Sequence, residues 1–296
     1  MIEERKKEKP KYLIITADDF GVCHSVNEAI IKLLENKVIS GATLMAPCSW
    51  AIEAGEWGRM HPEVSIGVHI TLTSEWKNYK WGPVTRNKSV STLTDKYGYF
   101  PERAEDLIGN VDEKELEEEI RNQILLVKKF GISPSHLDNH MGSLYYVNGR
   151  TYLHLLIDIC AEYNIPLRLP RYLPQDVLKR MGQDAIDVHM KLVDMAKKKN
   201  VPIIDYLISY PYELKTCTSY NSFISMIINL LKNLKPGVSE IIIHPSVESD
   251  EIKAFNPTWE KRVWEFLVFK NELVKATIER ENINIISYKD LRNLTI

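Results

Sequence analysis

Apolar and amphipathic stretches alternate along the whole chain. Apolar runs that end in polar residues predict buried strands, at about 13–21, 42–46, 64–70, 135–140, 165–169, 202–205, 240–245 and 283–287. Apolar residues at helical spacing predict helices between them, at about 26–34, 52–60, 113–130, 152–163, 184–199, 223–234 and 258–281. This alternation indicates a parallel sheet with helices packed on its outside.

The number of predicted strands favours a barrel. Seven or eight strands within 296 residues suit an irregular (β/α) TIM-like barrel of parallel strands better than an open, doubly wound sheet. The sequence shows no composition shift, low-complexity linker or internal repeat, so we expect a single domain over residues 1–296. It has neither a G-x-G-x-x-G motif after the first strand nor a G-x-x-x-x-G-K-[ST] motif, which argues against dinucleotide and P-loop chemistry.

A connection at about 71–111 interrupts the alternation. It is much longer than an ordinary βα loop and is rich in aromatic residues: Trp76, Tyr79, Trp81, Tyr97, Tyr99 and Phe100. One interpretation is an inserted lid or binding loop whose rings, Trp76 among them, contact a sugar. The other, given equal weight, is a local satellite core or a dimer contact.

Composition and charge narrow the class of protein. Hydrophobic residues make up 44% of the chain and charged residues 26%, which is typical of a globular protein. Lys and Arg number 38 against 40 Asp and Glu, and the net charge of -2 gives no attraction to nucleic acid or an anionic membrane. The charged N-terminus has no signal-peptide core, and no stretch is long enough to span a bilayer. The four cysteines have no C-x-x-C spacing, so we expect reduced thiols in a cytoplasmic protein; they are Cys23, Cys48, Cys160 and Cys217.

Polar residues that can do chemistry lie at the ends of predicted strands. They are Asp18–Asp19, His69, the segment His136–His140, and His244. Because the carboxyl ends of barrel strands meet on one face, these residues can surround a single ion. Two adjacent buried carboxylates also need a cation or a proton. One carboxylate and two imidazoles form a familiar site for a divalent metal, and we expect Asp19, His69 and His140 to be the ligands.

Neighbouring residues have candidate roles around the ion. Asp138 can orient an imidazole through its second nitrogen, while His136 is a partner inside the barrel. Asp18 can accept a proton from metal-bound water; its alternative role is to support the ligands or cap a helix. His244, on another strand, can act as the general acid that protonates a leaving amine, or serve as a structural cap.

The remaining polar residues have weaker patterns. Arg168 follows an apolar strand, where it can keep Asp18 ionised, bind substrate oxygens or form a salt bridge inside the barrel. His24 and Asn27, just past the glycine turn, can line the pocket. Histidines without such neighbours are interpreted as solvated or structural, namely His61, His154 and His189.

Three motifs occur in order along the chain: Thr16-Ala-Asp-Asp-Phe-Gly21, Gly67-Val-His-Ile-Thr-Leu72 and His136-Leu-Asp-Asn-His140. Together they resemble the YdjC-like carbohydrate deacetylase family, which includes chitooligosaccharide deacetylase. The resemblance extends through Ser40–Met45, Gly98–Phe100 and Ile243–Pro245, so it covers most of the chain.

The resemblance implies an irregular, polysaccharide-deacetylase-like barrel that removes an acetyl group from an N-acetylated mono- or oligosaccharide by metal-assisted hydrolysis. Carried over residue by residue, Asp19, His69 and His140 match the metal ligands, Asp18 the base and His244 the acid. The implied partner is a small acetylated sugar. Zinc and magnesium are the first expectations for the ion and manganese stays open, as does a homodimer.

One segment departs from the family pattern. After His140 the family typically continues with further histidines, whereas this chain has Met141-Gly-Ser-Leu-Tyr145, which predicts a different wall beside the metal ligands. Two other functions stay open. Two histidines and a carboxylate also describe a non-heme iron oxygenase, and a barrel of this kind can bind carbohydrate without catalysis.

Overall fold

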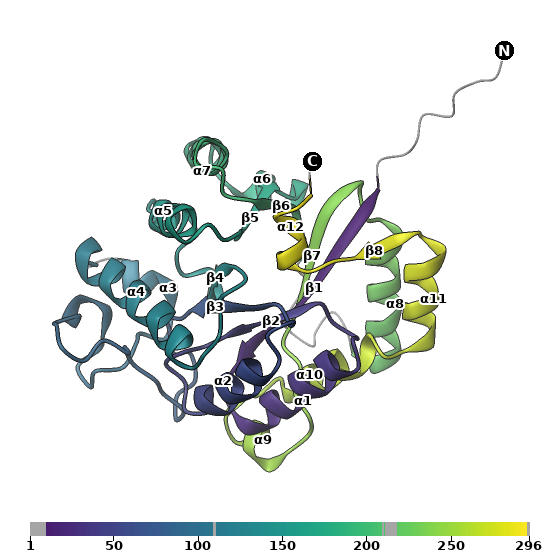
Figure 1. The fold of residues 1–296 in the computed structure, drawn as a ribbon, viewed down its shortest axis with the longest axis horizontal. Coiled ribbons are helices and arrows are strands. Elements are labelled where there is room, and N and C mark those ends of the chain that lie inside the picture. Colours follow the sequence, from purple (N-terminus) through teal and green to yellow (C-terminus); the bar gives the residue numbers. More distant parts are fainter. Residues whose placement is uncertain (1–9, 109–110, 209, 211–217, 295–296) are drawn as a thin grey trace.

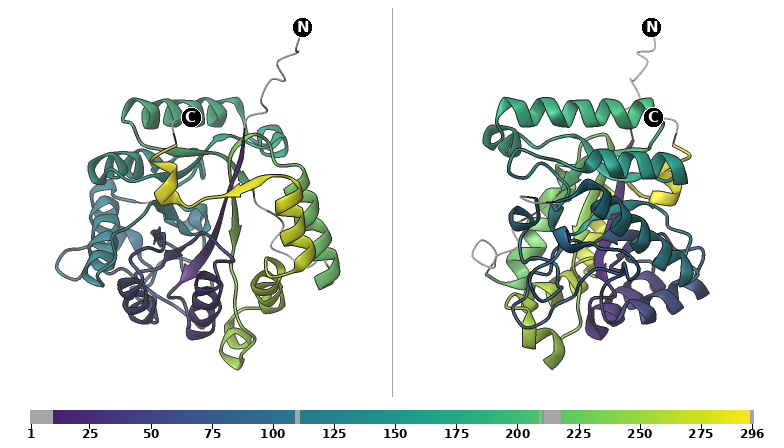
Figure 2. Two further views of the ribbon diagram at one scale, coloured as in Figure 1. Left: turned by 45° about the vertical axis from the view of Figure 1, so that its right-hand side comes forward. Right: turned by 90° about the vertical axis from the view of Figure 1, so that its left-hand side faces the viewer.

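Eight parallel strands lie at the centre of the protein, with helices around them (Figures 1 and 2). This computed structural model describes residues 10–108, 111–208, 210 and 218–294. The strands are β1 (Lys11–Phe20), β2 (Gly41–Leu44), β3 (Ile66–Ile70), β4 (Leu137–Asn139), β5 (Leu167–Tyr172), β6 (Ile203–Ile208), β7 (Gly237–Ile243) and β8 (Ile283–Ile285). The helices are α1 (His24–Glu35), α2 (Ala51–Met60), α3 (Ala104–Ile108), α4 (Glu113–Lys129), α5 (Leu153–Tyr163), α6 (Gln175–Arg180), α7 (Gln183–Lys198), α8 (Tyr220–Lys232), α9 (Asp250–Phe255), α10 (Trp259–Val268), α11 (Glu272–Arg280) and α12 (Tyr288–Leu291), with 3₁₀ turns at Ser91–Leu93 and His140–Gly142.

Strand β1 closes the sheet into a barrel. Along one edge it pairs with β7. Along the other edge it pairs first with β8, at Lys11–Leu13, and then with β2, from Thr16 onward. Strands β1 to β7 therefore form a closed ring, and β8 lies beside the beginning of β1 (Figure 2). The predicted TIM-like α/β barrel is confirmed.

The apolar pattern explains why β1 occupies this position. Every residue from Leu13 to Phe20 is buried. Side chains on one face of such a strand fill the barrel interior, and those on the other face pack under helices, so a strand inside a parallel barrel is apolar on both faces. Each predicted strand coincides with an observed one, with ends that differ by a few residues.

The prediction of one long helix at 258–281 is wrong. Two helices, α10 and α11, occupy this range and are separated by a turn at Phe269–Asn271. The Asn271 side chain accepts a hydrogen bond from the Leu273 N–H and so caps α11. Apolar residues continue at helical spacing across the turn, so the hydrophobic pattern did not indicate the break.

The connection at 71–111 is held against the barrel by a buried carboxylate. Glu119 of α4 accepts hydrogen bonds of 3.0 Å from the backbone N–H groups of Val84 and Thr85. Trp81 and Phe100 are buried in the same core, whereas Tyr97 and Tyr99 are exposed. Most of the connection is thus packed structure; residues 109–110 lie outside the described ranges.

Two further expectations concern the cysteines and membrane-spanning segments. Cys23, Cys48 and Cys160 are buried free thiols, and Cys217 lies outside the described residues, as do residues 1–9 of the charged N-terminus. Within the described ranges, no helix has the length and apolar character needed to cross a membrane.

Candidate metal centre

An irregularity in β1 brings two adjacent carboxylates to the same side of the strand. Ala17 is paired with Ala42, and the next pair along is Phe20 with Leu44. Two residues of β1, Asp18 and Asp19, therefore lie opposite one residue of β2, which is a β-bulge. Asp19 also has a left-handed backbone with a φ of 68°. Neighbouring residues in a regular strand point to opposite faces, and this bulge lets both carboxylates reach the barrel interior.

Three potential ligand atoms face one another at the end of the barrel. The Oδ1 atom of Asp19 lies 3.7 Å from Nε2 of His69 and 3.4 Å from Nδ1 of His140. The two ring nitrogens are 3.3 Å apart. All three side chains are buried, and their ligand atoms lie within 4.8 Å of one another. The structure therefore brings together the three residues that the sequence named as ligands.

Carboxylates on the outer nitrogens orient both rings. Nδ1 of His69 lies 2.8 Å from Asp138 Oδ1, and Nε2 of His140 lies 3.0 Å from Glu75 Oε2. A carboxylate accepts hydrogen bonds, so each outer nitrogen carries a proton, and the inner nitrogen is the one that could bind an ion once it is deprotonated. Burial alone would lower the pKa of His140, but Glu75 and Asp19 raise it to about 10. The same negative surroundings attract a cation.

The donor set fits a divalent ion. The Oδ1 atom of Asp19 is buried and accepts no hydrogen bond from the described part of the chain. It faces two imidazole nitrogens, which are common ligands for zinc and other divalent metals. A second cluster, of Asp18, His69 and Asp138, is also close enough to bind an ion, but Arg168 already lies against both of its carboxylates. The cluster that contains Asp19 is therefore the better candidate for a cation site.

Arg168 pairs with Asp18 through both guanidinium NH₂ groups. Nη1 donates to Oδ2 at 2.7 Å and Nη2 to Oδ1 at 2.8 Å, and the Thr43 hydroxyl donates to Oδ1 at 3.0 Å. Burial raises the pKa of Asp18, but Arg168 and His69 outweigh this effect and lower it to about 2. Asp18 is consequently ionised at neutral pH.

Arg168 is itself fixed by a carboxylate that the sequence analysis missed. Glu240 of β7 accepts hydrogen bonds from Nε and Nη2 of Arg168, at 3.0 and 2.9 Å. Glu240 also accepts hydrogen bonds from the hydroxyl groups of Thr16 and Tyr288, both at 2.6 Å. A charged residue within the apolar run of β7 was the available signal, because a fully buried glutamate needs partners.

Glu75 and Arg262 also contact the site, although no sequence pattern identified them as site residues. Nη2 of Arg262, on α10, donates to Asp19 Oδ2 at 2.7 Å, which leaves Oδ1 facing the two histidines. Trp76 lies behind this arginine, with its ring centroid 5.7 Å from the guanidinium carbon and 4.6 Å from the Phe255 centroid. No spacing in the sequence connects α10 or the 71–111 connection with β1.

A cavity of about 240 Å³ opens beside the candidate metal centre. Asp18, His69, Arg168 and His244 line it, so the proposed acid and base share one space. Burial lowers the pKa of His244 to about 3 despite the raising effect of Asp19 and Asp18. The imidazole is therefore neutral near pH 7.

Three other residues named from the sequence, Asn27, His24 and His136, do not line this cavity. Asn27 accepts a 2.7 Å hydrogen bond from the Gly21 N–H, and it therefore fixes the turn after the two carboxylates. His24 is exposed and lies 2.8 Å from Glu53. The ring of His136 is buried and stacks on Tyr288, with centroids 3.7 Å apart.

The fold and these side chains can be compared with known proteins. A family model described as "YdjC-like protein" matches residues 12–280. The chain belongs to the YdjC-like family. Two relatives named carbohydrate deacetylase match it over nearly the whole length of both chains: that from Thermoanaerobacter pseudethanolicus is 24% identical over 284 residues (95% of this chain, 100% of the relative), and that from Geobacillus stearothermophilus 25% over 287 residues (96% and 100%).

A solved structure shows a similar fold. It is that of an Enterococcus faecalis protein described as a cellobiose-phosphate cleavage protein. The TM-score is 0.76 at 24% identity, with 95% of this chain and 99% of that chain covered. At this level of identity the likeness supports the barrel architecture alone.

Proposed function

We propose that this protein is a metal-dependent hydrolase that removes the acetyl group from an N-acetylated mono- or oligosaccharide. The main support is the pair of adjacent carboxylates, of which Asp19 faces two histidines while Asp18 lies beside them in the cavity. The relatives named carbohydrate deacetylase support the class of substrate. The proposed products are acetate and a free amino sugar.

Asp19, His69 and His140 would hold the ion, with zinc or magnesium expected first and manganese left open. When bound, such an ion polarises a carbonyl oxygen and lowers the pKa of water to roughly 7. Asp138 and Glu75 keep the two rings oriented for this role, because each accepts the proton of an outer nitrogen.

Asp18 is the proposed base, and Oδ2 is the atom that accepts the proton. Oδ1 already accepts hydrogen bonds from Thr43 and Arg168, whereas Oδ2 accepts one from Arg168 alone among the described residues. Oδ2 lies 3.9 Å from Nε2 of His69, next to the ligand atoms. Because its pKa is about 2, Asp18 is ionised but weakly basic. It would therefore accept a proton most readily from a water molecule whose pKa a bound ion had lowered.

His244 is proposed to protonate the leaving nitrogen. The water oxygen bonds to the acetyl carbon, the C–N bond breaks, and the nitrogen must gain a proton to leave as an amine. His244 begins neutral because burial lowers its pKa, so the proton that Asp18 removes from the water must pass to His244 before His244 delivers it to the nitrogen. One proton leaves the water and one reaches the nitrogen, which balances the reaction.

An acetate-release screen tests the proposal. Metal-stripped protein is supplied with zinc, magnesium or manganese and is given N-acetylated and O-acetylated mono- and disaccharides. We expect acetate release that depends on the metal, and we expect Asp18→Asn to lower kcat by about 10²- to 10⁴-fold. Metal binding, measured by calorimetry, is expected to persist in this variant, because Asp18 is not among the proposed ligands.

The matched control is Asp158→Asn, which changes an exposed carboxylate on α5. It is expected to keep normal turnover. Normal turnover in Asp18→Asn would refute the assignment of the base. Sugar binding without acetate release at any of the three metals would instead favour a non-catalytic carbohydrate-binding protein.

A further inference from the structure

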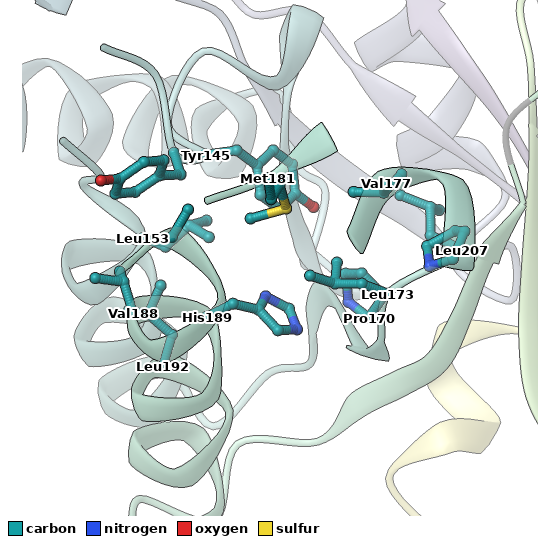
Figure 3. A pocket seen from close by; sticks show the side chains of 13 residues that line it. Tyr145, Leu153, Pro170, Leu173, Val177, Met181, Val188, His189, Leu192 and Leu207 are labelled. Carbon is teal, nitrogen blue, oxygen red and sulfur yellow. The ribbon is translucent and has the colours of Figure 1, made fainter. Parts of the chain in front are cut away.

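A second cavity lies next to the catalytic one and has a different character. Its volume is about 380 Å³, and it lies among α5, α6, α7 and the strands β5 and β6 (Figure 3). Its walls include Leu153, Leu173, Val177, Met181, Val188 and Leu192. Among the described residues that line it there is no carboxylate, ammonium or guanidinium group. A cavity with such walls binds hydrocarbon better than it binds water.

The two cavities share a wall. Tyr145 and Leu207 line both of them. The Tyr145 hydroxyl donates a 2.8 Å hydrogen bond to the backbone carbonyl of Arg168, the residue that pairs with Asp18. The position of this shared tyrosine is therefore fixed relative to the proposed base. A molecule that reacts beside Asp18 would therefore have to extend past Tyr145 and Leu207 to enter the apolar cavity.

One polar side chain projects into the apolar cavity. His189 is half-buried on α7, and its ring points into the space (Figure 3). Its Nε2 atom is buried and makes no hydrogen bond of ordinary geometry with the described residues, although backbone groups of Pro170 and Arg171 lie close enough to the ring to act on its pKa. An unsatisfied buried nitrogen is costly, and an oxygen of a bound molecule would satisfy it. The sequence interpretation of His189 as solvated or structural did not foresee this position.

We propose that the natural substrate carries an alkyl or aryl group that occupies this cavity while its N-acylated amino sugar lies in the catalytic cavity. The inference rests on the proposed function, since it names the substrate class of the same site. The apolar group can be joined at the anomeric oxygen, as an aglycone, or at the nitrogen, as an acyl chain longer than acetyl. Either attachment buries hydrocarbon against the apolar walls of this cavity.

Two substrate series distinguish the attachments. The aglycone series compares the methyl, butyl and octyl glycosides of N-acetylglucosamine, and the acyl series compares N-acetyl-, N-butyryl- and N-octanoylglucosamine. In one series we expect kcat/KM to rise about fourfold for each methylene that enters the cavity, because each buried methylene adds a similar increment of binding. A flat or falling kcat/KM in both series would overturn the inference.

Filling the cavity provides the matched test. Ala185→Phe and Val188→Phe place a ring in the cavity and are expected to abolish the gain in kcat/KM with chain length. Met190→Phe, on the exposed face of the same helix, is the control and is expected to keep the gain. Circular dichroism and Tm show which variants fold. A gain that survives in both folded cavity variants would also contradict the proposal.

A binding measurement separates this inference from the proposed function. Octyl and methyl β-glucosides carry no acetamide, so their Kd values, measured by calorimetry, do not depend on catalysis. Tighter binding of the octyl glucoside that is lost in Ala185→Phe supports the cavity assignment even if no sugar is deacetylated, in which case only the proposed function fails. Equal Kd values for the two glucosides, together with a flat kcat/KM in the acyl series, would overturn the inference while leaving deacetylation intact.

Discussion

Each histidine of the candidate metal centre is oriented by a carboxylate on its second ring nitrogen. Asp138 does this for His69, but it also pairs with Arg168 and thus belongs to the buried charge network. Glu75 does it for His140 from the 71–111 connection. Glu75 can therefore be changed without disturbing the arginine that pairs with Asp18.

We predict that Glu75→Gln weakens zinc binding by about 10- to 100-fold. Glutamine is neutral and accepts the His140 Nε2 proton less strongly, so the inner nitrogen is held less firmly and is less basic. Competition with a chromophoric chelator measures the affinity. Glu102→Gln, an exposed glutamate of the same connection that pairs with Lys80, is expected to bind zinc normally. Equal affinities for the two variants would mean that His140 does not depend on Glu75.

The second prediction at this scale concerns stability in acid. The pKa of Asp18 falls from 3.8 to about 2 on folding, so this group contributes stability that is complete above pH 3.8 and is lost as the pH falls through about 2. The contribution is about 2 kcal/mol, and about half of it is lost by pH 3. Urea unfolding of the metal-free protein at pH 6 and pH 3 should show wild type losing about 1 kcal/mol more than Asp18→Asn. Identical losses in the two proteins would contradict the ion pair with Arg168.

Sequence reasoning found some of these residues and not others for a physical reason. Asp18, Asp19 and His69 end apolar strands, and parallel strands of a barrel end on one face, so the pattern alone brings them together. Arg262 and Glu75 reach the same place from α10 and from a long connection. Their positions depend on how those segments pack, which no local period encodes.

At the scale of elements, the turn after β1 determines how the carboxylates are presented. Gly21 has a φ of 100°, and its N–H is held by Asn27. A Cβ atom at this position would lie 3.0 Å from the Ala51 Cα of α2. Glycine is thus required here both by the backbone conformation and by the neighbouring helix.

We predict that Gly21→Ala lowers the free energy of unfolding by about 2–3 kcal/mol and also reduces turnover. Gly98→Ala is the matched control, since Gly98 has a φ of 84° but no atom within 4 Å of the added Cβ. Its expected cost is about 1 kcal/mol, from backbone conformation alone. Urea unfolding and acetate release measure the two effects. If the two variants lost the same stability, the close approach to α2 would be unimportant.

Helices and strands could be predicted from the sequence where all side chains on one face have the same surroundings. The strands β1 and β7 contain apolar runs, Leu13–Ile15 and Ile241–Ile243, because both faces of the strands are covered, and α4 has a clear apolar stripe. The break between α10 and α11 was not predicted, because apolar residues continue at helical spacing through it. There the cap by Asn271, rather than the hydrophobic pattern, ends one helix and begins the next.

At the scale of the whole molecule, the proposed ion would join distant parts of the barrel. Its ligands come from β1, from β3 and from the turn that follows β4. An ion that binds only the folded arrangement stabilises it by mass action. The presence of the metal should therefore change the Tm of the protein as well as its turnover.

We predict that zinc at about 100 times its Kd raises Tm by about 5 °C over protein treated with a chelator. Asp19→Ala and His140→Ala are expected to lose this difference, because each removes a proposed ligand. Asp158→Asn is expected to keep it. Differential scanning calorimetry measures all four proteins. A rise of the same size in Asp19→Ala would show that the metal binds elsewhere.

The extra residue of β1 has a consequence for how the gene can vary. Asp18 and Asp19 share one side of the strand only because two residues there oppose one residue of β2. Loss of a single codon between Thr16 and Gly21 would leave an apolar strand but remove the bulge. Successive side chains would then alternate strictly between the two faces of the strand, so one of two adjacent carboxylates would point toward the surrounding helices. We therefore expect the number of residues in this segment to tolerate less change than the identity of most nearby side chains. Gain or loss of one codon here should abolish activity while the protein still folds.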